Sequence, residues 1–384
     1  MAETSKIPRL WCSARLNLAV LAMLGCICFY SLRVNLSFSV VCMVNHTAIA
    51  PAADKGSQSN NSVSSSGREE GTAESSCGQT DGNTSVSYED GELLWDKEQQ
   101  GLVLGSIFWG YMLTNIVAGI IATHYGGKRV IGSALFCAAI LTATTPVAAR
   151  SGVVAVITVR VLIGICLGCI SPALHALWAQ WAPPLESSML RSFCFAGCQM
   201  GYVLTFPVTA LLCEYGFDGG WPSVFYVMAG MVLVWCLLWT FLVTDSPLDH
   251  PRISAEEQSY IVTSLKGTIS MNKVWAAFVC HTCCNWGEYT FLTNIPTYMR
   301  EVLHFDIKAN GLLSSLPYIF FWFVINVSGQ VADLIRRKQL MNTTRTRKLF
   351  NTLGSLVACM SAGRSGGFST AHMRRLLLYC LRWA

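Results

Sequence analysis

Four ionisable side chains fall inside long apolar stretches of the sequence, where such groups need a chemical reason. Arg33 lies in the first stretch, Arg160 and His175 lie in the fourth, and Glu288 lies in the seventh. A charged side chain at the centre of a membrane helix costs roughly 2.5–3.5 kcal/mol on insertion scales. Residues of this kind mark substrate or ion pathways by default, so these four are the first candidates for function.

Arg33 needs a negative partner, either a protein carboxylate or an anionic substrate. No Asp or Glu lies within the first four apolar stretches. A substrate carboxylate or phosphate is therefore at least as well supported as a protein partner. Tyr30 and Ser37 stand at i−3 and i+4, one helical turn from Arg33 on either side, so they can line the same cavity.

The seventh stretch holds a polar group of residues around Glu288. Asn285 and Tyr289 flank this carboxylate and are candidates for contact with a substrate. His281, Cys283 and Cys284 lie just before it, but no second ligand pair follows at zinc spacing. We therefore expect no metal site and no cofactor. No nucleophile–base pair stands out either, which argues against an enzyme.

The composition explains why these groups are exceptional. Hydrophobic residues make up 52% of the 384 and charged residues only 13%, whereas a soluble domain carries about 25% charged residues. The net charge of +5 is spread along the chain, which argues against nucleic acid as a partner. Nearly all 17 Cys lie in apolar stretches, which argues against a disulfide framework.

Apolar stretches near 20 residues can cross a bilayer as helices. Eight are present, and a ninth begins near Leu349 and ends early. The sequence thus predicts an all-α membrane protein embedded in lipid. The eight predicted spans cover residues 16–44, 99–123, 130–149, 152–178, 192–214, 221–243, 274–298 and 309–333.

The polar segments divide this pattern into parts. We expect a cytosolic N-terminus (1–15), a first half of six helices (16–243), a cytosolic linker (244–272) and an incomplete second half (273–360). The last part, 361–384, is a basic tail that breaks the apolar pattern. Within the first half, residues 45–97 form a long loop rich in Ser, Gly and Asn.

Lys and Arg are concentrated in one set of loops, as at Lys128, Arg129 and the run Arg336–Lys338. Such loops face the cytosol, so the loop 45–97 lies on the opposite side. Three glycosylation sequons in that loop agree with this orientation, because acceptor sites belong to the non-cytosolic side. Their acceptors are Asn45, Asn60 and Asn83.

Recurring glycines indicate how the helices pack. Gly164-x3-Gly168 and Gly197-x3-Gly201 have the spacing that lets transmembrane helices approach closely. A second pattern follows spans two and eight: Gly119 and Gly329 each precede, by four residues, a polar position and then a basic cluster. In the second copy that position is Asp333, which we expect to take part in a cytosolic gate.

Several motifs resemble the family of the sialin, vesicular glutamate and type I sodium–phosphate transporters, from about residue 10 to 360. The motifs are Tyr30-Ser-Leu-Arg33-Val-Asn-Leu-Ser37, Gly105-Ser-Ile-Phe-Trp-Gly-Tyr111, Pro172-Ala-Leu-His175, Trp181-Ala-Pro-Pro-Leu-Glu186, Asn285-Trp286, Pro296-Thr-Tyr-Met299 and Leu313-Ser-Ser-Leu-Pro-Tyr318.

The resemblance implies a major facilitator fold of twelve spans, of which about eight and part of a ninth are present here. It implies that Arg33 binds a substrate carboxylate, that Tyr30 and Tyr111 line the site, and that His175 is functionally sensitive. The implied activity is transport of a small organic anion, such as sialic acid or another acidic sugar, coupled to a proton or sodium cation. A lysosomal or other vesicular membrane is implied, with the plasma membrane as the alternative.

The chain departs from the family in three places. Ile163 and Leu167 stand where the family has two glutamates, and Glu288 stands where it has an aromatic residue. After Met360 the sequence no longer resembles the family. These departures leave two alternatives open: sodium- or potential-driven transport of phosphate, glutamate or another organic anion, and a truncated isoform that does not transport.

Overall fold

The computed structural model describes residues 13–45, 91–264, 307–343, 345–346 and 349–350. These residues form helices, with one isolated bridge between Val44 and Leu93. The elements in order are α1 (Ala14–Met43), α3 (Lys97–Tyr125), α4 (Gly127–Ser151), α5 (Val153–Gly168), α6 (Ile170–Trp181), α7 (Ser187–Tyr215), α8 (Trp221–Leu242), the 3-10 turn η2 (Pro247–Asp249), α9 (Ala255–Ser264) and α11 (Ile307–Arg337).

The predicted helical membrane fold is confirmed. Among the described residues, six helices are long and apolar enough to cross a membrane, or seven when the bent α3 is counted as one span. The predicted span 152–178 appears as α5 and α6, which break at Cys169. Pro172 explains the break, because proline has no N–H to donate back to Gly168. The predicted span 274–298 and the tail 361–384 lie outside the described residues.

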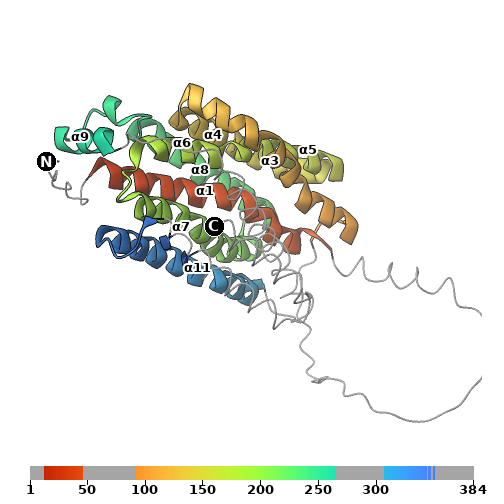
Figure 1. The fold of residues 1–384 in the computed structure, drawn as a ribbon. Coiled ribbons are helices and arrows are strands. Elements are labelled where there is room, and N and C mark those ends of the chain that lie inside the picture. The colour runs from red at the N-terminus through yellow and green to blue at the C-terminus, as the bar shows by residue number, and fades with distance from the viewer. Residues whose placement is uncertain (1–12, 46–90, 265–306, 344, 347–348, 351–384) are drawn as a thin grey trace, which may run out of the picture.

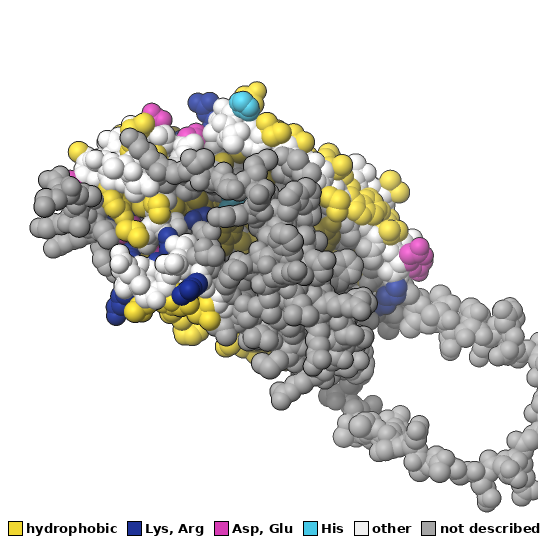
Figure 2. Space-filling view, viewed as in Figure 1, with side chains coloured by type: hydrophobic (Ala, Val, Ile, Leu, Met, Phe, Trp, Pro, Cys, Tyr) yellow, Lys and Arg dark blue, Asp and Glu magenta, His cyan; other side chains and the backbone are white. Residues whose placement is uncertain are grey.

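The helices lie side by side along one direction, with α1 near the middle of the bundle (Figure 1). α7 packs between α1 and α11, while α5 packs on both α3 and α4. Hydrophobic side chains spread along the described surface of the bundle in the view of Figure 2. Met112, Val154 and Phe241 are among the most exposed large hydrophobic side chains of the described residues. Such an exterior is suited to contact with lipid tails rather than water.

Glycines set the closest helix contacts, as the sequence predicts. A Cβ atom on Gly164 or Gly168 would collide with the backbone of α3, at Ile107 and Tyr111 respectively. A Cβ atom on Gly197 or Gly201 would collide with α1. The prediction that these two glycine pairs serve helix packing is therefore confirmed.

Arg15 ties together three elements at the predicted cytosolic end of α1. It is fully buried, its Nε atom donates to the Glu257 carboxylate of α9 at 2.8 Å, and a second nitrogen donates to Glu186, which precedes α7. Glu257 also accepts from the backbone N–H groups of Ala14 and Arg15 at 3.2 Å each. The linker helix α9 therefore supplies the anion that the N-terminus of α1 favours.

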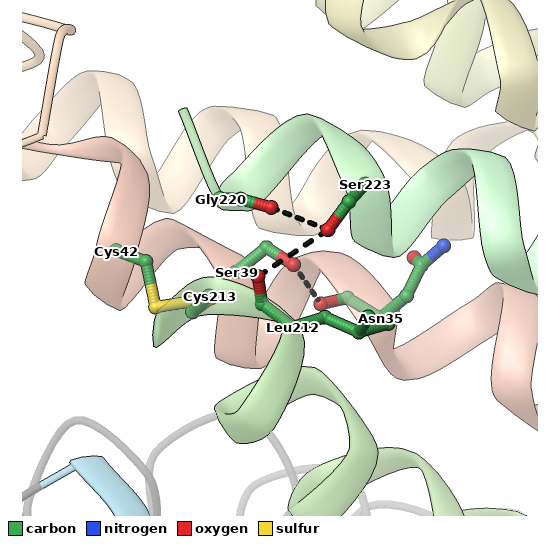
Figure 3. The surroundings of a disulfide bond; sticks show 7 residues. All are labelled: Asn35, Ser39, Cys42, Leu212, Cys213, Gly220 and Ser223. Atoms are coloured by element: carbon green, nitrogen blue, oxygen red, sulfur yellow. Dashed lines mark hydrogen bonds between the residues drawn. A yellow bond between two sulfur atoms is a disulfide. The ribbon is translucent and has the colours of Figure 1, made fainter. Parts of the chain in front are cut away.

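A disulfide joins Cys42 at the end of α1 to Cys213 near the end of α7 (Figure 3). This bond corrects the expectation drawn from the placement of cysteines in apolar stretches. Packing of α1 along α7 brings the two residues together across 171 positions of sequence, with a Cα–Cα distance of 6.2 Å. Disulfides persist in oxidising compartments, so this end of the bundle fits the predicted non-cytosolic side.

Replacement of Arg15 by Gln is expected to destabilise the fold, because it leaves Glu186 and Glu257 buried without their shared cation, at a cost of about 3–5 kcal/mol. The measurement is the melting temperature of detergent-solubilised protein. The control is Arg150→Gln, since Arg150 also contacts two carboxylates, Asp218 and Glu92, but is 42% exposed. Equal melting temperatures for the two variants would contradict this interpretation.

Replacement of Cys42 by Ser is expected to free the Cys213 thiol. A membrane-impermeant maleimide applied from the non-cytosolic side should then label Cys213 in the variant and leave it unlabelled in the parent. Peptide mass spectrometry reads the result, with a Cys42→Ser, Cys213→Ser double variant as the control. Labelling of Cys213 in the parent would show that the bond does not form.

Candidate functional site

Aromatic rings from two helices surround the Arg33 guanidinium. The Cζ atom of Arg33 lies 4.8 Å from the ring centroid of Tyr111 and 5.1 Å from that of Phe108, both on α3. On its own helix it lies 5.7 Å from Tyr30 and 6.0 Å from Phe29. Rings within about 6 Å attract a cation through their electron-rich faces. They hold the guanidinium in place without neutralising it.

Arg160 lies next to Arg33 in the interior. Its Nη2 atom donates to the backbone carbonyl of Arg33 at 3.4 Å, and the side chain is almost fully buried. The Nε atom of Arg160 has no hydrogen-bond partner in the described part of the chain. Two positive charges in one apolar interior repel each other, and an anion near them relieves that cost.

Carboxylates are absent from the middle of the spans that the structure describes. Within these spans Glu98, Glu214 and Asp333 lie near helix ends. Ile163 and Leu167 follow Arg160 on α5 at one-turn spacing and are completely buried. The face of α5 that carries Arg160 thus consists of apolar side chains beyond this arginine. The described spans offer no acid beside Arg160 on α5.

The other predicted site residues divide into those near Arg33 and those elsewhere. Tyr111 lies near Arg33 and its hydroxyl donates to Ser171 at 3.4 Å. Ser37 is buried on α1, one turn beyond Arg33. His175 is exposed on α6 and its ring lies 5.2 Å from that of Phe195, so it is not part of the aromatic group around Arg33.

Asp333 joins α11 to the start of α7 at the predicted cytosolic end. Its carboxylate is buried and accepts a hydrogen bond from the backbone N–H of Met189 at 2.7 Å. A carboxylate at the start of a helix accepts a hydrogen bond from a backbone N–H that has no partner within the helix. The positive end of the helix dipole stabilises its negative charge. Gly329, four residues earlier, faces Ser192 of α7 and permits the close approach.

A second contact strengthens this junction. Arg337 of α11 lies 3.4 Å from the Glu186 carboxylate, which also contacts Arg15. Burial raises the pKa of Glu186, and the positive charges of Arg15 and Arg337 oppose that shift. We call the contacts Asp333–Met189 and Arg337–Glu186 the cytosolic latch, because they join α11 to the helices that precede the linker at the end of the bundle that we expect to face the cytosol.

Several predicted site residues are not placed. Asn285, Glu288 and Tyr289, with the acceptors Asn60 and Asn83, lie outside the described residues. Asn45 is described: its backbone N–H donates to Leu93 at 2.9 Å, at the same end of the bundle as the disulfide.

Sequence reasoning missed Phe29 and Phe108 as neighbours of Arg33, and Glu186 and Glu257 as partners of Arg15. Phe108 lies one turn before Tyr111, and this spacing, which places both residues on one helix face, could have indicated that Phe108 also lies near Arg33.

A profile of the Major Facilitator Superfamily matches residues 22–382. Human sialin is 39% identical over 359 residues, which cover 90% of this chain and 68% of that protein. An uncharacterized transporter of Caenorhabditis elegans, slc-17.2, is 37% identical, with 94% of this chain and 73% of that protein covered. Vesicular glutamate transporter 1 of Xenopus tropicalis is 33% identical, with 88% of this chain and 56% of that protein covered.

Solved structures support the same fold. The proton:xylose symporter XylE bound to 6-bromo-6-deoxy-D-glucose superposes with a TM-score of 0.59 at 15% identity, covering 96% of this chain and 78% of that one. At this identity the likeness concerns the fold alone. A further relative is a putative inorganic phosphate cotransporter of Drosophila melanogaster, which is 37% identical over 371 residues, or 92% of this chain and 67% of that protein. The chain belongs to the Major Facilitator Superfamily, and within it to the family of sialin, the vesicular glutamate transporters and the phosphate cotransporters.

Proposed function

We propose that this membrane transporter carries small organic anions and that Arg33 binds the anionic group of the substrate. The observation that carries the proposal is a buried guanidinium held among four aromatic rings with a second buried arginine, Arg160, beside it. This arrangement fixes the direction of a planar cation, and a carboxylate pairs with such a cation through two parallel hydrogen bonds.

A carboxylated sugar suits this site better than inorganic phosphate does. Rings such as those of Tyr111 and Phe108 offer apolar faces beside the cation, and a sugar ring with a carboxylate has both an apolar face and an anionic group. Sialic acid is therefore the first substrate to test, and the similarity to human sialin agrees with that choice. Relatives named for phosphate and glutamate make these two anions the comparison substrates.

The cytosolic latch supplies a mechanism for alternating access. Transporters of this architecture expose a central site to one side at a time by rocking two halves against each other. We propose that Asp333 and Arg337 hold the cytosolic side closed, and that opening to the cytosol breaks their contacts with Met189 and Glu186.

His175 and Arg160 are proposed to take part in coupling and gating. A lysosomal or vesicular membrane, with glycans on the loop that contains Asn45, Asn60 and Asn83, completes the proposal.

Replacement of Arg33 by Ala is expected to abolish saturable uptake of sialic acid into vesicles that contain the protein. Arg33→Lys should fail as well, because a lysine provides a point charge instead of a planar fork. Arg150→Ala is the matched control, since Arg150 also lies over an aromatic ring, that of Trp221 at 5.6 Å, but at the surface. Retained uptake in Arg33→Ala at normal expression would refute the role of Arg33.

Proton coupling is expected to be weak or carried by Glu288. A coupling carboxylate must titrate, and Ile163 and Leu167 cannot. Uptake should be measured across pH for the parent, for Glu288→Gln and for Ile163→Glu with Leu167→Glu. We expect the last variant to gain pH dependence, because both new carboxyls would be buried on the face of Arg160. Strong proton-driven uptake by both the parent and Glu288→Gln would contradict this prediction.

A further inference from the structure

A series of aromatic side chains in contact connects Arg33 to α11. Tyr30 lies beside the Arg33 guanidinium, at 5.7 Å from its ring centroid to Cζ. Tyr202 of α7 meets Tyr30 edge to face, with 5.1 Å between ring centroids. Tyr318 of α11 lies 4.2 Å from Tyr202, with its ring tilted by 38°. We call these three tyrosines the tyrosine series.

The middle of the series is confined. Tyr202 is completely buried and Tyr318 is 5% exposed. A Cβ atom on Gly201 would lie 2.7 Å from the Cβ of Tyr30, so this glycine is what allows Tyr30 to rest directly against α7. The packing density of such an interior leaves little free space. A shift of Tyr202 is therefore transmitted to Tyr30.

The series crosses the junction between the two parts of the transporter. Tyr30 and Tyr202 precede the linker 244–272, whereas Tyr318 follows it. Rocking of one part against the other moves α11 relative to α7. This motion changes the contact between Tyr318 and Tyr202 first, because that contact joins the two helices. Within the described residues, Tyr318 is the member of this aromatic group that α11 contributes.

We propose that Tyr318 is a positioning residue for anion binding. With α11 docked on α7, Tyr318 holds Tyr202, Tyr202 holds Tyr30, and Tyr30 keeps the Arg33 guanidinium directed for a carboxylate. When α11 moves away, Tyr202 and Tyr30 gain freedom and the anion binds less tightly. The affinity for the anion thus depends on the position of α11. This inference rests on the proposed role of Arg33.

The alternative is that Tyr318 only fills space between α7 and α11. Phe206 allows the two roles to be separated, because it is equally buried and belongs to the same cluster. Its ring contacts are with Tyr202 at 6.3 Å, Tyr318 at 5.9 Å and Phe38 at 6.0 Å. Loss of this ring damages the packing of the cluster while the Tyr318–Tyr202–Tyr30 contacts remain.

The experiment compares Tyr318→Leu, Tyr318→Phe and Phe206→Leu with the parent, each purified and reconstituted in liposomes. Sialic acid is the uptake probe, and KM, Vmax and melting temperature are measured. Tyr318→Leu should raise KM about two- to tenfold, as expected for the loss of one aromatic contact, with a smaller change in Vmax. Tyr318→Phe keeps the ring and should retain the parent KM. Phe206→Leu should lower the melting temperature and leave KM unchanged.

A second readout needs no substrate. Phenylglyoxal modifies exposed guanidiniums, and mass spectrometry gives its rate of reaction with Arg33. That rate should rise in Tyr318→Leu and stay at the parent value in Tyr318→Phe and Phe206→Leu. Absence of saturable uptake in the parent would refute the proposed function, while this rate still tests the positioning role. Equal KM values and equal Arg33 rates in Tyr318→Leu and the parent would overturn the inference, as would equal effects of Tyr318→Leu and Phe206→Leu.

Discussion

The structure depends on the neutralisation of one buried arginine, Arg15. Its guanidinium lies in the interior between the carboxylates of Glu186 and Glu257, and Glu257 also accepts from the first N–H groups of α1. A buried charge without such partners is strongly unfavourable. Because the two acids lie just before α7 and on the linker helix α9, satisfying Arg15 fixes how three separate parts of the chain meet.

This requirement positions the site because α1 and α7 are held along their whole length. The Arg15 contacts join them at one end, the Cys42–Cys213 disulfide joins them at the other, and Gly197 and Gly201 let them touch in between. Arg33 lies on α1 between these contacts. Its position along the bundle and the direction of its side chain are therefore fixed. α3 and α5 then place Phe108, Tyr111 and Arg160 around it through their own glycine contacts.

The carboxylate of Glu186 also connects α11 to this arrangement. Arg337 shares Glu186 with Arg15 but is 42% exposed, so this bond is weaker than the fully buried one. Burial also raises the pKa of Glu186, which shows that keeping this carboxylate ionised has a cost. Desolvation offsets much of the attraction within ion pairs of this kind, so they add little net stability. The Arg337 contact with Glu186 is thus open to solvent at its Arg337 side, whereas the Arg15 contact with the same carboxylate is buried.

The sequence by itself determined the helical membrane fold, indicated the family through its motifs, and led to the proposal of Arg33 as the central residue. The fold and the proposal of Arg33 follow from local properties: the length of an apolar stretch, glycine spacing, and the cost of a charge inside it. Only the tertiary structure decided which partners meet. Arg15 finds its acids 171 and 242 residues away, Cys42 pairs with Cys213, and Asp333 caps α7 rather than its own helix. Packing of whole helices sets these contacts, and no pattern within a single helix encodes them.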